Sequence, residues 1–297
     1  MNYKKINIGF FGDGLWALNS LLLIKKEKIF LIKFICLRNK KPDLKIIIFA
    51  KQNNIKYFIL NNVNDRSSLK KIKLFNLDII ISMSYDQIFK KKIINHYKYR
   101  IINCHAGNLP FYRGRSPLNW VLINDEKFFG ITVHYIDKKI DQGDIILQNK
   151  YPIKDKDDYK SIINKAYKEC PRLIIKALKL IISKKVKPIK QRLINIKGSY
   201  YKKRLPGDEI INWKSNSREI FCFIRGLSKP SVMAKTYLKR RPIYINRSDH
   251  KFLPNKKNLL PGTILEITDR FFVVKTGNSS IKIKEWKGKV QKGLRLL

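Results

Sequence analysis

Residues 100–117 read RIINCHAGNLPFYRGRSP, and this stretch decides the fold. The run at residues 100–103 is typical of a buried strand, and it leads into a polar loop that Gly and Pro interrupt. An open α/β sheet presents ligand-binding groups at such places, where its strands end. Because residues two apart on an extended backbone point the same way, Asn103 and His105 can face a common point. The sequence therefore predicts a site at the end of this strand.

Strand-like and helix-like runs alternate on the N-terminal side of this stretch. Such alternation predicts an α/β fold with a Rossmann-like, mainly parallel sheet and helices on both faces. The expected strands are residues 6–11, 30–37, 57–60, 78–82 and 100–103, and the expected helices are residues 15–24, 44–53, 67–75 and 87–94. Two further β-rich runs predict antiparallel strands at the far edge, at residues 130–135 and 145–149, and a long helix is expected at residues 158–183.

A second unit follows a segment with little periodicity. Residues 184–206 contain Lys-Lys, Pro188 and Gly198, and they predict a linker. Beyond it, apolar residues at helical spacing predict a helix within residues 213–226, and short β-like runs after residue 237, separated by turns such as Pro254-Asn255, predict a small barrel or sheet. We therefore expect a larger domain at residues 1–183, the linker at 184–206 and a smaller β-rich domain at 207–297.

The composition is that of a globular protein with a large positive charge. Of 297 residues, 44% are hydrophobic, and 64 Lys and Arg outnumber 22 Asp and Glu, for a formal charge of +42. Such a charge alone suggests a polyanionic partner such as a nucleic acid. Lysines are scattered through every segment beside many Ile and Asn residues, however, as an A/T-rich genome would impose. The alternative is a solvated basic surface that favours phosphate-bearing small substrates.

Cysteines and apolar runs indicate the compartment. The four cysteines, at positions 36, 104, 170 and 222, show neither C-x-x-C pairing nor metal-ligand spacing, and they predict reduced, mostly buried thiols. The N-terminal residues lack the pattern of a secretion signal, and the longest apolar runs are too short to span a bilayer. We therefore expect a cytoplasmic protein without membrane attachment and without a bound metal.

The first glycine cluster, residues 9–14, lies between an expected strand and an expected helix. Backbone N–H groups at a helix N-terminus can bind a phosphate. The glycine spacing differs from G-x-G-x-x-G, however, and no acidic residue ends the next strand in the usual ribose-binding manner. A tight turn that borders a ligand at Gly12 is therefore preferred to a dinucleotide site.

Residues 103–152 carry several linked motifs. They are Asn103-Cys104-His105, Leu109-Pro110, Tyr112-Arg113-Gly114 with Pro117, Gly130-Ile131-Thr132-Val133-His134 and Ile140-Asp141-Gln142-Gly143-Asp144. Together they resemble the folate-dependent formyltransferase family, whose motifs are N-x-H-x-S-L-L-P, Y-R-G-x-x-P, G-x-T-x-H and L-D-x-G-D. The chain departs from the first motif at residues 106–108, Ala-Gly-Asn, which affects the expected acceptor pocket rather than the chemistry. Residues 201–213 and 223–227 are similar to the opening of that family's C-terminal domain, so the resemblance covers nearly the whole chain.

The resemblance implies a formyltransferase fold and transfer of a formyl group from N10-formyltetrahydrofolate to an amine, with no metal. Addition of the amine to the formyl carbon creates negative charge on oxygen and positive charge on nitrogen. The Asn103 amide would donate to the oxyanion, an interaction typically worth about 3 kcal/mol. His105 would take up the amine proton, because histidine side chains ordinarily titrate near working pH. Asp141 would orient His105 and stabilise its cationic form, or hold a relay water.

The resemblance also implies binding residues around these three catalytic candidates. The candidates for folate binding are Ser84 and Tyr85, in a loop similar to the one beside the folate pteridine, and Leu109, Pro110, Ile140 and Asp144. The candidates for substrate binding are Gly12, Tyr112, Arg113, Arg115, Asn119 and Trp120. Plainer alternatives stay open: solvated loop charges for the two arginines, a core position for Trp120 and a backbone cap for Asp144. His134 is predicted to be packed or to border a ligand rather than to act as a second base.

Residues 111–120, FYRGRSPLNW, look most like family members that formylate 4-amino sugars carried on nucleotides. We therefore expect a dTDP- or UDP-4-amino-4-deoxy sugar as the acceptor, in lipopolysaccharide or O-antigen biosynthesis. A homodimer stays open, because related sugar enzymes often dimerise. The alternative is methionyl-tRNA formyltransferase, whose positive charge would grip tRNA, although residues 37–45 lack the expected tRNA-clamping insertion. A nucleic-acid-binding protein on an inactive scaffold is a third hypothesis, which the catalytic candidates argue against.

Overall fold

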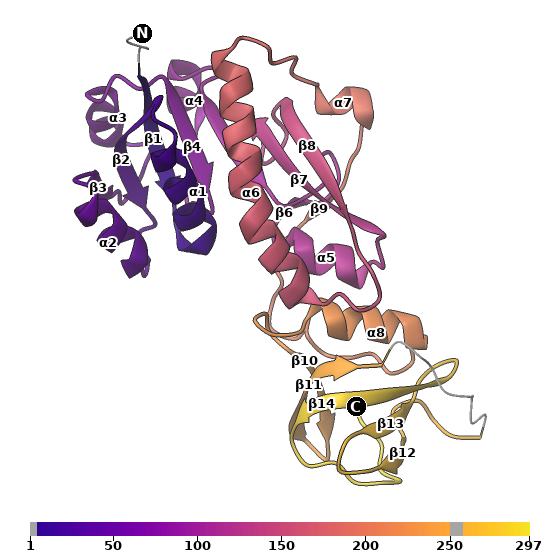
Figure 1. Ribbon diagram of the computed structural model, residues 1–297. Helices are drawn as coiled ribbons and strands as arrows, with labels where there is room; N and C mark the ends of the chain where they lie inside the picture. The colour runs from indigo at the N-terminus through magenta and orange to yellow at the C-terminus, as the bar shows by residue number, and fades with distance from the viewer. Residues whose placement is uncertain (1–4, 250–257) are drawn as a thin grey trace. The chain divides into compact units, whose positions relative to one another are not determined.

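The computed structural model describes residues 5–249 and 258–297, which form two compact units (Figure 1). The first unit consists of Met1–Gly114, Gly130–Lys150 and Lys165–Tyr200, and the second of Arg115–Phe129, Tyr151–Asn164 and Tyr201–Leu297. This grouping differs from the domain limits expected from the sequence at residues 183 and 207. The reason is that helix α5 (Pro117–Ile123) packs on helix α8 (Ser217–Gly226), both in the second unit.

A seven-stranded sheet of order β3-β2-β1-β4-β5-β7-β8 is the centre of the first unit. Its strands are β1 (Ile6–Gly12), β2 (Phe30–Leu37), β3 (Lys56–Ile59), β4 (Ile79–Met83), β5 (Ile101–His105), β7 (Phe128–Tyr135) and β8 (Ile145–Pro152). The first five pair in parallel, and β7 pairs antiparallel with β5. The predicted α/β class, with its parallel sheet and antiparallel far edge, is confirmed.

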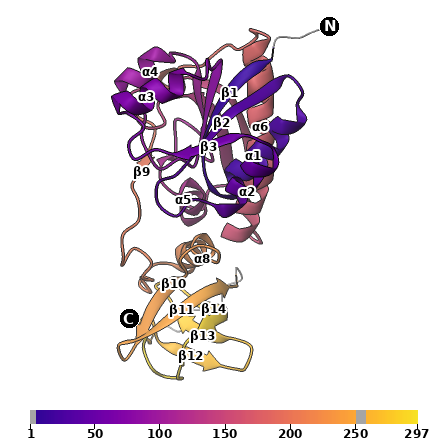
Figure 2. The same ribbon diagram turned by 90° about the vertical axis from the view of Figure 1, so that its left-hand side faces the viewer.

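Helices cover both faces of this sheet, which explains why its central strands are continuous apolar runs. Helices α1 (Gly14–Lys26) and α2 (Leu44–Gln52) lie on one face, and α3 (Arg66–Lys73) and α4 (Lys91–His96) lie on the other (Figure 2). The long helix α6 (Tyr159–Ile182) joins the α1 side, where the Trp16 and Tyr167 ring centroids lie 4.6 Å apart. All five residues of β4 are buried. The carboxyl ends of β4 and β5 therefore lie at the edge of a sheet that helices cover on both faces.

The turn from β1 into α1 is tight, as the glycine cluster predicts. A side chain at Gly12 would collide with the Met83 carbonyl oxygen at the end of β4. The next residue, Asp13, is buried and caps α1 by accepting from the Gly14 N–H at 3.0 Å. Its Oδ2 also lies 2.6 Å from Arg38 Nε. This turn therefore serves the packing of β1 against β4 and the start of α1.

The second unit contains a small antiparallel sheet together with helices α5 and α8 and the first residues of α6. Its strand order is β10 (Ala234–Leu238), β11 (Arg241–Ser248), β14 (Ser280–Lys287), β13 (Phe272–Lys275) and β12 (Ile264–Ile267). Helix α8 begins with a capping box between Asn216 and Glu219, and its apolar side joins the sheet in one core. The predicted β-rich C-terminal part is confirmed, whereas the turn expected at Pro254-Asn255 lies outside the described residues.

The segment predicted as a linker contains two short elements. These are helix α7 (Gln191–Ile194) and strand β9 (Tyr200–Tyr201), and β9 pairs with the two-residue strand β6 (Arg113–Gly114). The segment also forms an isolated bridge between Ile189 and Ile145. Across residues 5–249 and 258–297, none of the helices has the length and apolar character needed to traverse a bilayer.

Asp125 joins two arginines inside the second unit. Arg218 donates from Nε to Asp125 Oδ2 at 2.8 Å and from Nη2 to Oδ1 at 2.6 Å, and Arg225 Nη2 donates to Oδ1 at 3.0 Å. The hydrogen bonds from Arg218 lower the pKa of Asp125 to about 2, against the opposing effect of burial. A carboxyl group with a lowered pKa stabilises the folded state above its unfolded pKa, and this contribution disappears as the pH falls.

We therefore expect Asp125→Asn to lower the thermal unfolding midpoint at neutral pH, because the buried Arg225 guanidinium loses the nearer of its two charged partners, Asp125 and Asp155. The difference from wild type should shrink as the pH falls from about 4 to about 2, where Asp125 itself becomes protonated. Circular dichroism melts across this range measure the effect, with Asp269→Asn as an exposed control. A difference that stays constant across the range would contradict the assignment.

Candidate active site

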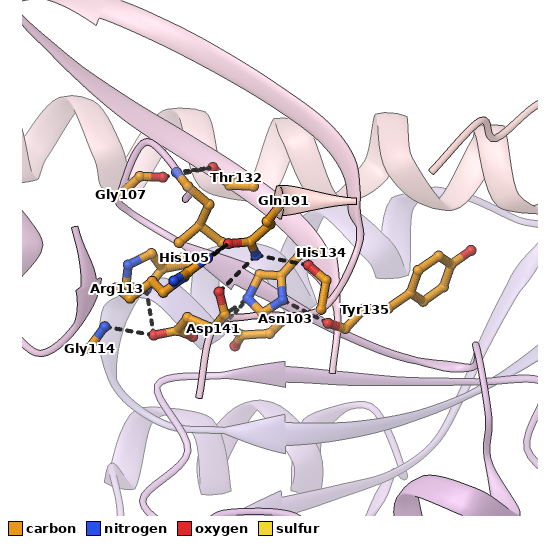
Figure 3. Close-up of polar contacts among 12 residues, drawn as sticks. Asn103, His105, Gly107, Arg113, Gly114, Thr132, His134, Tyr135, Asp141 and Gln191 are labelled. Carbon is orange, nitrogen blue, oxygen red and sulfur yellow. Dashed lines mark hydrogen bonds and ion pairs between the residues drawn. The ribbon is translucent and has the colours of Figure 1, made fainter. Parts of the chain in front are cut away.

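Strands β5 and β7 place the candidate side chains at one point. The antiparallel register sets Asn103 opposite His134 and His105 opposite Thr132. Since residues two apart on a strand share a face, Asn103 and His105 lie on the same side of the sheet. Figure 3 shows both of them beside His134 and Asp141. The structure thus brings together in space the three residues that the motifs single out, Asn103, His105 and Asp141.

His134 sets the orientation of the Asn103 amide. The ring of His134 is only 2% exposed, and its Nδ1 lies 2.8 Å from the Tyr135 carbonyl oxygen. A carbonyl only accepts, so Nδ1 carries the hydrogen of the neutral ring and Nε2 keeps its lone pair. Asn103 Nδ2 lies 3.1 Å from this Nε2 and donates to it. The second N–H of the Asn103 amide then stays available for another acceptor.

The ring of His105 is fixed in the same way. Its Nε2 lies 2.7 Å from the Tyr112 carbonyl oxygen, so Nε2 donates and Nδ1 keeps the lone pair. Nδ1 lies 3.7 Å from Asp141 Oδ2, which is too long for a hydrogen bond, but a proton taken up by Nδ1 would be attracted to the carboxylate at this distance. His105 is 8% exposed, so little water screens this attraction. The nitrogen of His105 that can accept a proton therefore lies beside a carboxylate.

Asp141 lies between two imidazole rings in the loop after β7. Its Oδ2 accepts from the Gly114 N–H at 2.9 Å, and its Oδ1 lies 3.6 Å from His134 Nε2. Burial by itself would raise the pKa of the Asp141 carboxyl, but His105, His134 and the Gly114 N–H together hold that pKa well below its usual value. Asp141 is therefore a carboxylate throughout the neutral range, and it places a negative charge beside both rings.

These groups supply the parts of an acyl-transfer site. The free N–H of Asn103 can stabilise an oxyanion, and Nδ1 of His105 can accept a proton whose charge Asp141 then offsets. Cys104, between the two in sequence, is buried with Sγ 3.9 Å from the Cys170 carbonyl oxygen, as expected for a packed thiol. Within the described ranges, no group of three His, Cys, Asp or Glu side chains is arranged to hold a metal ion.

A pocket of about 120 Å³ opens beside Asn103 and Asp141. Its walls are formed by Ser82, Gln87, Ile88, Phe89, Asn103, His134, Ile136, Asp137, Lys139, Ile140 and Asp141. The lining combines apolar side chains, such as Phe89 and Ile136, with the Asn103 amide and the Asp141 carboxylate. Of the six residues expected to bind folate, Ile140 lines this pocket. The other five are not among the described residues that line it.

Those other residues have contacts elsewhere. The Tyr85 ring packs against Phe11 and Phe89, at centroid distances of 5.3 and 5.9 Å, and burial raises the pKa of its hydroxyl well above the usual value. Ser84, just before it, is exposed. Leu109, Pro110 and Asp144 contribute backbone carbonyl groups to hydrogen bonds. The Leu109 carbonyl accepts from the Gln148 side chain, the Pro110 carbonyl accepts from the Ser199 N–H, and the Asp144 carbonyl accepts from the Tyr135 N–H. The Tyr85 side chain therefore packs against Phe89, which lines the pocket.

Arg113, expected to bind substrate, is used inside the protein. It is 7% exposed; its Nε and Nη2 donate to Gln191 Oε1 at 3.0 and 2.7 Å, and its Nη1 donates to the Lys197 carbonyl at 3.2 Å. We therefore assign Arg113 to ordering residues 191–197 rather than to a phosphate. Its neighbour Tyr112 contributes a carbonyl oxygen to His105.

The remaining candidates for substrate binding lie in different parts of the fold. Gly12 belongs to the turn after β1. Three others lie in the second unit: Arg115 is exposed, Asn119 is buried with Nδ2 donating to the Gly226 carbonyl at 2.7 Å, and Trp120 stacks on Tyr201 with ring centroids 4.9 Å apart. Asn119 thus joins α5 to α8. Only Arg115 keeps a side chain exposed as a donor for a ligand.

The sequence did not indicate the roles that two residues have in the site. The strand pattern predicts that His134 is packed or borders a ligand, and only the β5–β7 register shows that it orients Asn103. Gln191 lies in the segment expected to be a linker, yet it is 3% exposed and contacts the Asp141 loop. The strand pattern around Thr132 could have suggested the first. No local signal could have suggested the second.

Comparison with known proteins decides the family. Residues 8–178 match the formyl transferase family, and residues 205–295 match the formyl transferase C-terminal domain. The chain is a member of the formyl transferase family. This formyltransferase is 31% identical over 292 residues to the methionyl-tRNA formyltransferase of Fusobacterium nucleatum, covering 95% of this chain and 92% of that protein.

Two further relatives bear on the acceptor. This formyltransferase is 37% identical over 239 residues, 80% of its chain, to the bifunctional polymyxin resistance protein ArnA of Wigglesworthia glossinidia brevipalpis, and it spans only 34% of that protein. Among solved structures it is similar to WlaRD, a sugar 3N-formyl transferase crystallised in the presence of dTDP and 5-N-formyl-THF. The TM-score is 0.70 at 25% identity, covering 96% of this chain and 99% of WlaRD.

Proposed function

We propose that this formyltransferase moves a formyl group from N10-formyltetrahydrofolate to the amine of a nucleotide-linked amino sugar. The observation that carries the proposal is the placement of Asn103, His105 and Asp141 together at the end of β5, with His105 Nδ1 3.7 Å from the Asp141 carboxylate. A proton acceptor, an oxyanion donor and a fixed negative charge are what amine formylation requires. Likeness to WlaRD over almost the whole chain supports the sugar acceptor.

The pocket beside Asn103 suits the folate donor. Phe89, Ile136 and Ile140 offer apolar walls to a flat heterocycle, and the Asn103 amide and the Asp141 carboxylate line the same pocket. A formyl group carried on N10, one methylene away from such a ring, would meet the free Asn103 N–H. The presence of 5-N-formyl-THF in the WlaRD structure supports the same class of donor for this chain.

Asn103 and His105 then divide the chemistry. As the amine adds to the formyl carbon, Asn103 donates its free N–H to the oxygen that becomes negative, and His134 holds the amide in that orientation. His105 Nδ1 takes the proton from the nitrogen that becomes positive. Asp141 stabilises the resulting imidazolium. His105 finally returns the proton to N10 as the C–N10 bond breaks, so the ring ends neutral and the proton is conserved.

Methionyl-tRNA formyltransferase is the second candidate. The relative from Fusobacterium nucleatum that bears this name matches 95% of the chain at 31% identity, and the formal charge of +42 would suit a polyanion. We favour the sugar because residues 111–120 resemble sugar enzymes and because the similar structure WlaRD is a sugar 3N-formyl transferase. We place the reaction in the cytoplasm and in the synthesis of lipopolysaccharide or O-antigen sugars.

Mass spectrometry of acceptors tests this assignment. The protein is incubated with N10-formyltetrahydrofolate and, in parallel, with dTDP-3-aminofucose, dTDP-4-amino-4,6-dideoxyglucose, UDP-4-amino-arabinose and methionyl-tRNA. We expect one formyl group to be added to at least one sugar nucleotide and not to the tRNA. Formylation of the tRNA alone would overturn the sugar assignment and keep the family's reaction. The His105→Ala variant serves as the control in each arm.

A further inference from the structure

Gln191 is a buried amide whose four hydrogen bonds all reach the site. Its Oε1 accepts from Arg113 Nε at 3.0 Å and from Arg113 Nη2 at 2.7 Å. Its Nε2 donates to the Asp141 carbonyl and to the Gly143 carbonyl, both at 2.8 Å. Figure 3 shows Gln191 between Arg113 and Asp141. A residue 50 positions beyond Asp141 therefore holds the backbone on both sides of Gln142.

The partners permit one orientation of this amide. A guanidinium only donates and a carbonyl only accepts, so a flipped Gln191 would face donors with donors and acceptors with acceptors. At 3% exposure, water cannot replace the lost partners. All the hydrogen-bonding capacity that the amide offers is thus committed to Arg113 and to the Asp141 loop.

These contacts form a closed cycle of bonds that includes the Asp141 carboxylate. Gln191 binds Arg113, Arg113 is joined covalently to Gly114, the Gly114 N–H donates to Asp141 Oδ2, and the Asp141 carbonyl accepts from Gln191. This cycle holds both the backbone and the side chain of Asp141. Its members come from three separate parts of the first unit, residues 113–114, 141–143 and 191.

Asp141 needs such support because of its conformation and its surroundings. Its φ is +53°, a left-handed conformation that costs a non-glycine residue energy unless neighbours impose it. The residues just before it, 137–140, are exposed. Held only by that exposed loop, the carboxylate would sample other positions, and its distance to His105 Nδ1 would no longer be fixed.

We propose that Gln191 is a positioning residue for formyl transfer, which acts by fixing Asp141 beside His105. This inference rests on the proposed role of Asp141 in the reaction. It assigns a function to residues expected to be a mere linker. Outer residues that orient groups of a reactive site typically change activity by about 10–100-fold when replaced, and a loss of that size is expected here.

Two replacements of Gln191 separate its hydrogen bonds to the Asp141 loop from its hydrogen bonds to Arg113. Gln191→Glu keeps an acceptor for Arg113 but cannot donate to either carbonyl, whereas Gln191→Met removes both sets of bonds at similar size. If the hydrogen bonds to the Asp141 loop matter, both variants should lose kcat by about 10–100-fold with KM for donor and acceptor within about threefold. Gln142→Met, at an exposed neighbour in the same loop, is the matched control and should keep wild-type rates.

Assays are run at a temperature where circular dichroism shows each variant folded. A Gln191→Glu rate within twofold of wild type would overturn the proposal and leave only a structural role through Arg113. A rise in KM at constant kcat would overturn it as well. Asp141→Asn distinguishes the levels: if that variant keeps wild-type kcat, the proposed chemistry fails, whereas a slow Asp141→Asn beside a normal Gln191→Glu defeats this inference alone.

Discussion

Replacing His105 by alanine is expected to lower kcat for formyl transfer by about 10²–10⁴-fold, the usual contribution of a positioned general base. His105 Nδ1 is the lone pair that the Tyr112 carbonyl leaves available, and it lies beside the Asp141 carboxylate that would stabilise its charged form. Without it, the proton on the attacking nitrogen has no fixed acceptor, and the intermediate returns to starting materials. Binding should change little, because the imidazole acts during bond formation.

Single-turnover formylation, with substrate affinity measured separately by calorimetry, checks this expectation. His96→Ala is the matched control, since His96 is an exposed histidine in α4 of the same unit and should leave the rate unchanged. The His105→Ala variant also loses the hydrogen bond to Tyr112, so its fold is verified by a melting curve. A kcat above one tenth of wild type in a folded His105→Ala protein would show that another group carries the proton.

Asn103→Ala is expected to reduce kcat by about 10²–10³-fold, which corresponds to about 3–4 kcal/mol of lost transition-state stabilisation. The loss arises because the free N–H of the amide is the donor aimed at the developing oxyanion. Since this bond is strongest in the transition state, kcat and kcat/KM should fall together. Steady-state kinetics with the sugar acceptor that the mass-spectrometry assay selects measure both.

Asn103→Asp sharpens the same comparison. The size is retained, but a carboxylate would face His134 Nε2 and place negative charge where the oxyanion forms, so this variant should be at least as slow as Asn103→Ala. Asn95→Ala, at an exposed position of α4, controls for loss of an amide. If Asn103→Ala instead raised KM and kept kcat, the amide would bind the ground state and the oxyanion role would be wrong.

The parts of this fold that the sequence predicts are those that local pattern controls. Ile79, Ile80 and Ile81 form a continuous apolar run because their strand is covered on both faces, and that run is legible without any partner. Asn103 and His105 share a face because a strand alternates, so their convergence follows from spacing alone. The antiparallel partner β7 was equally readable from its length and alternation.

What the sequence could not predict depends on long-range contacts. Arg113 reads as a loop charge, and only its bonds to Gln191, 78 positions away, show that it is buried and committed. Tyr85 follows a strand as a ligand-binding aromatic would, yet its ring packs against both Phe11 and Phe89. The grouping of residues 115–129 with the C-terminal part likewise depends on α5 meeting α8. Such outcomes are set by tertiary packing, for which one sequence carries no local signal.

The bonds from Gln191 to the Asp141 loop also limit how chains of this family can be recombined. A crossover placed where the periodicity fades, near residue 184, would take Asn103, His105 and Asp141 from one parent and the strand-like segment after them from another. The chimera would carry every motif residue, but its Asp141 loop would contact a Gln191 segment that comes from a different parent. Exchange of acceptor specificity between relatives should therefore keep residues 189–200 with the N-terminal parent, so that inheritance follows the hydrogen bonds rather than the apparent domain border.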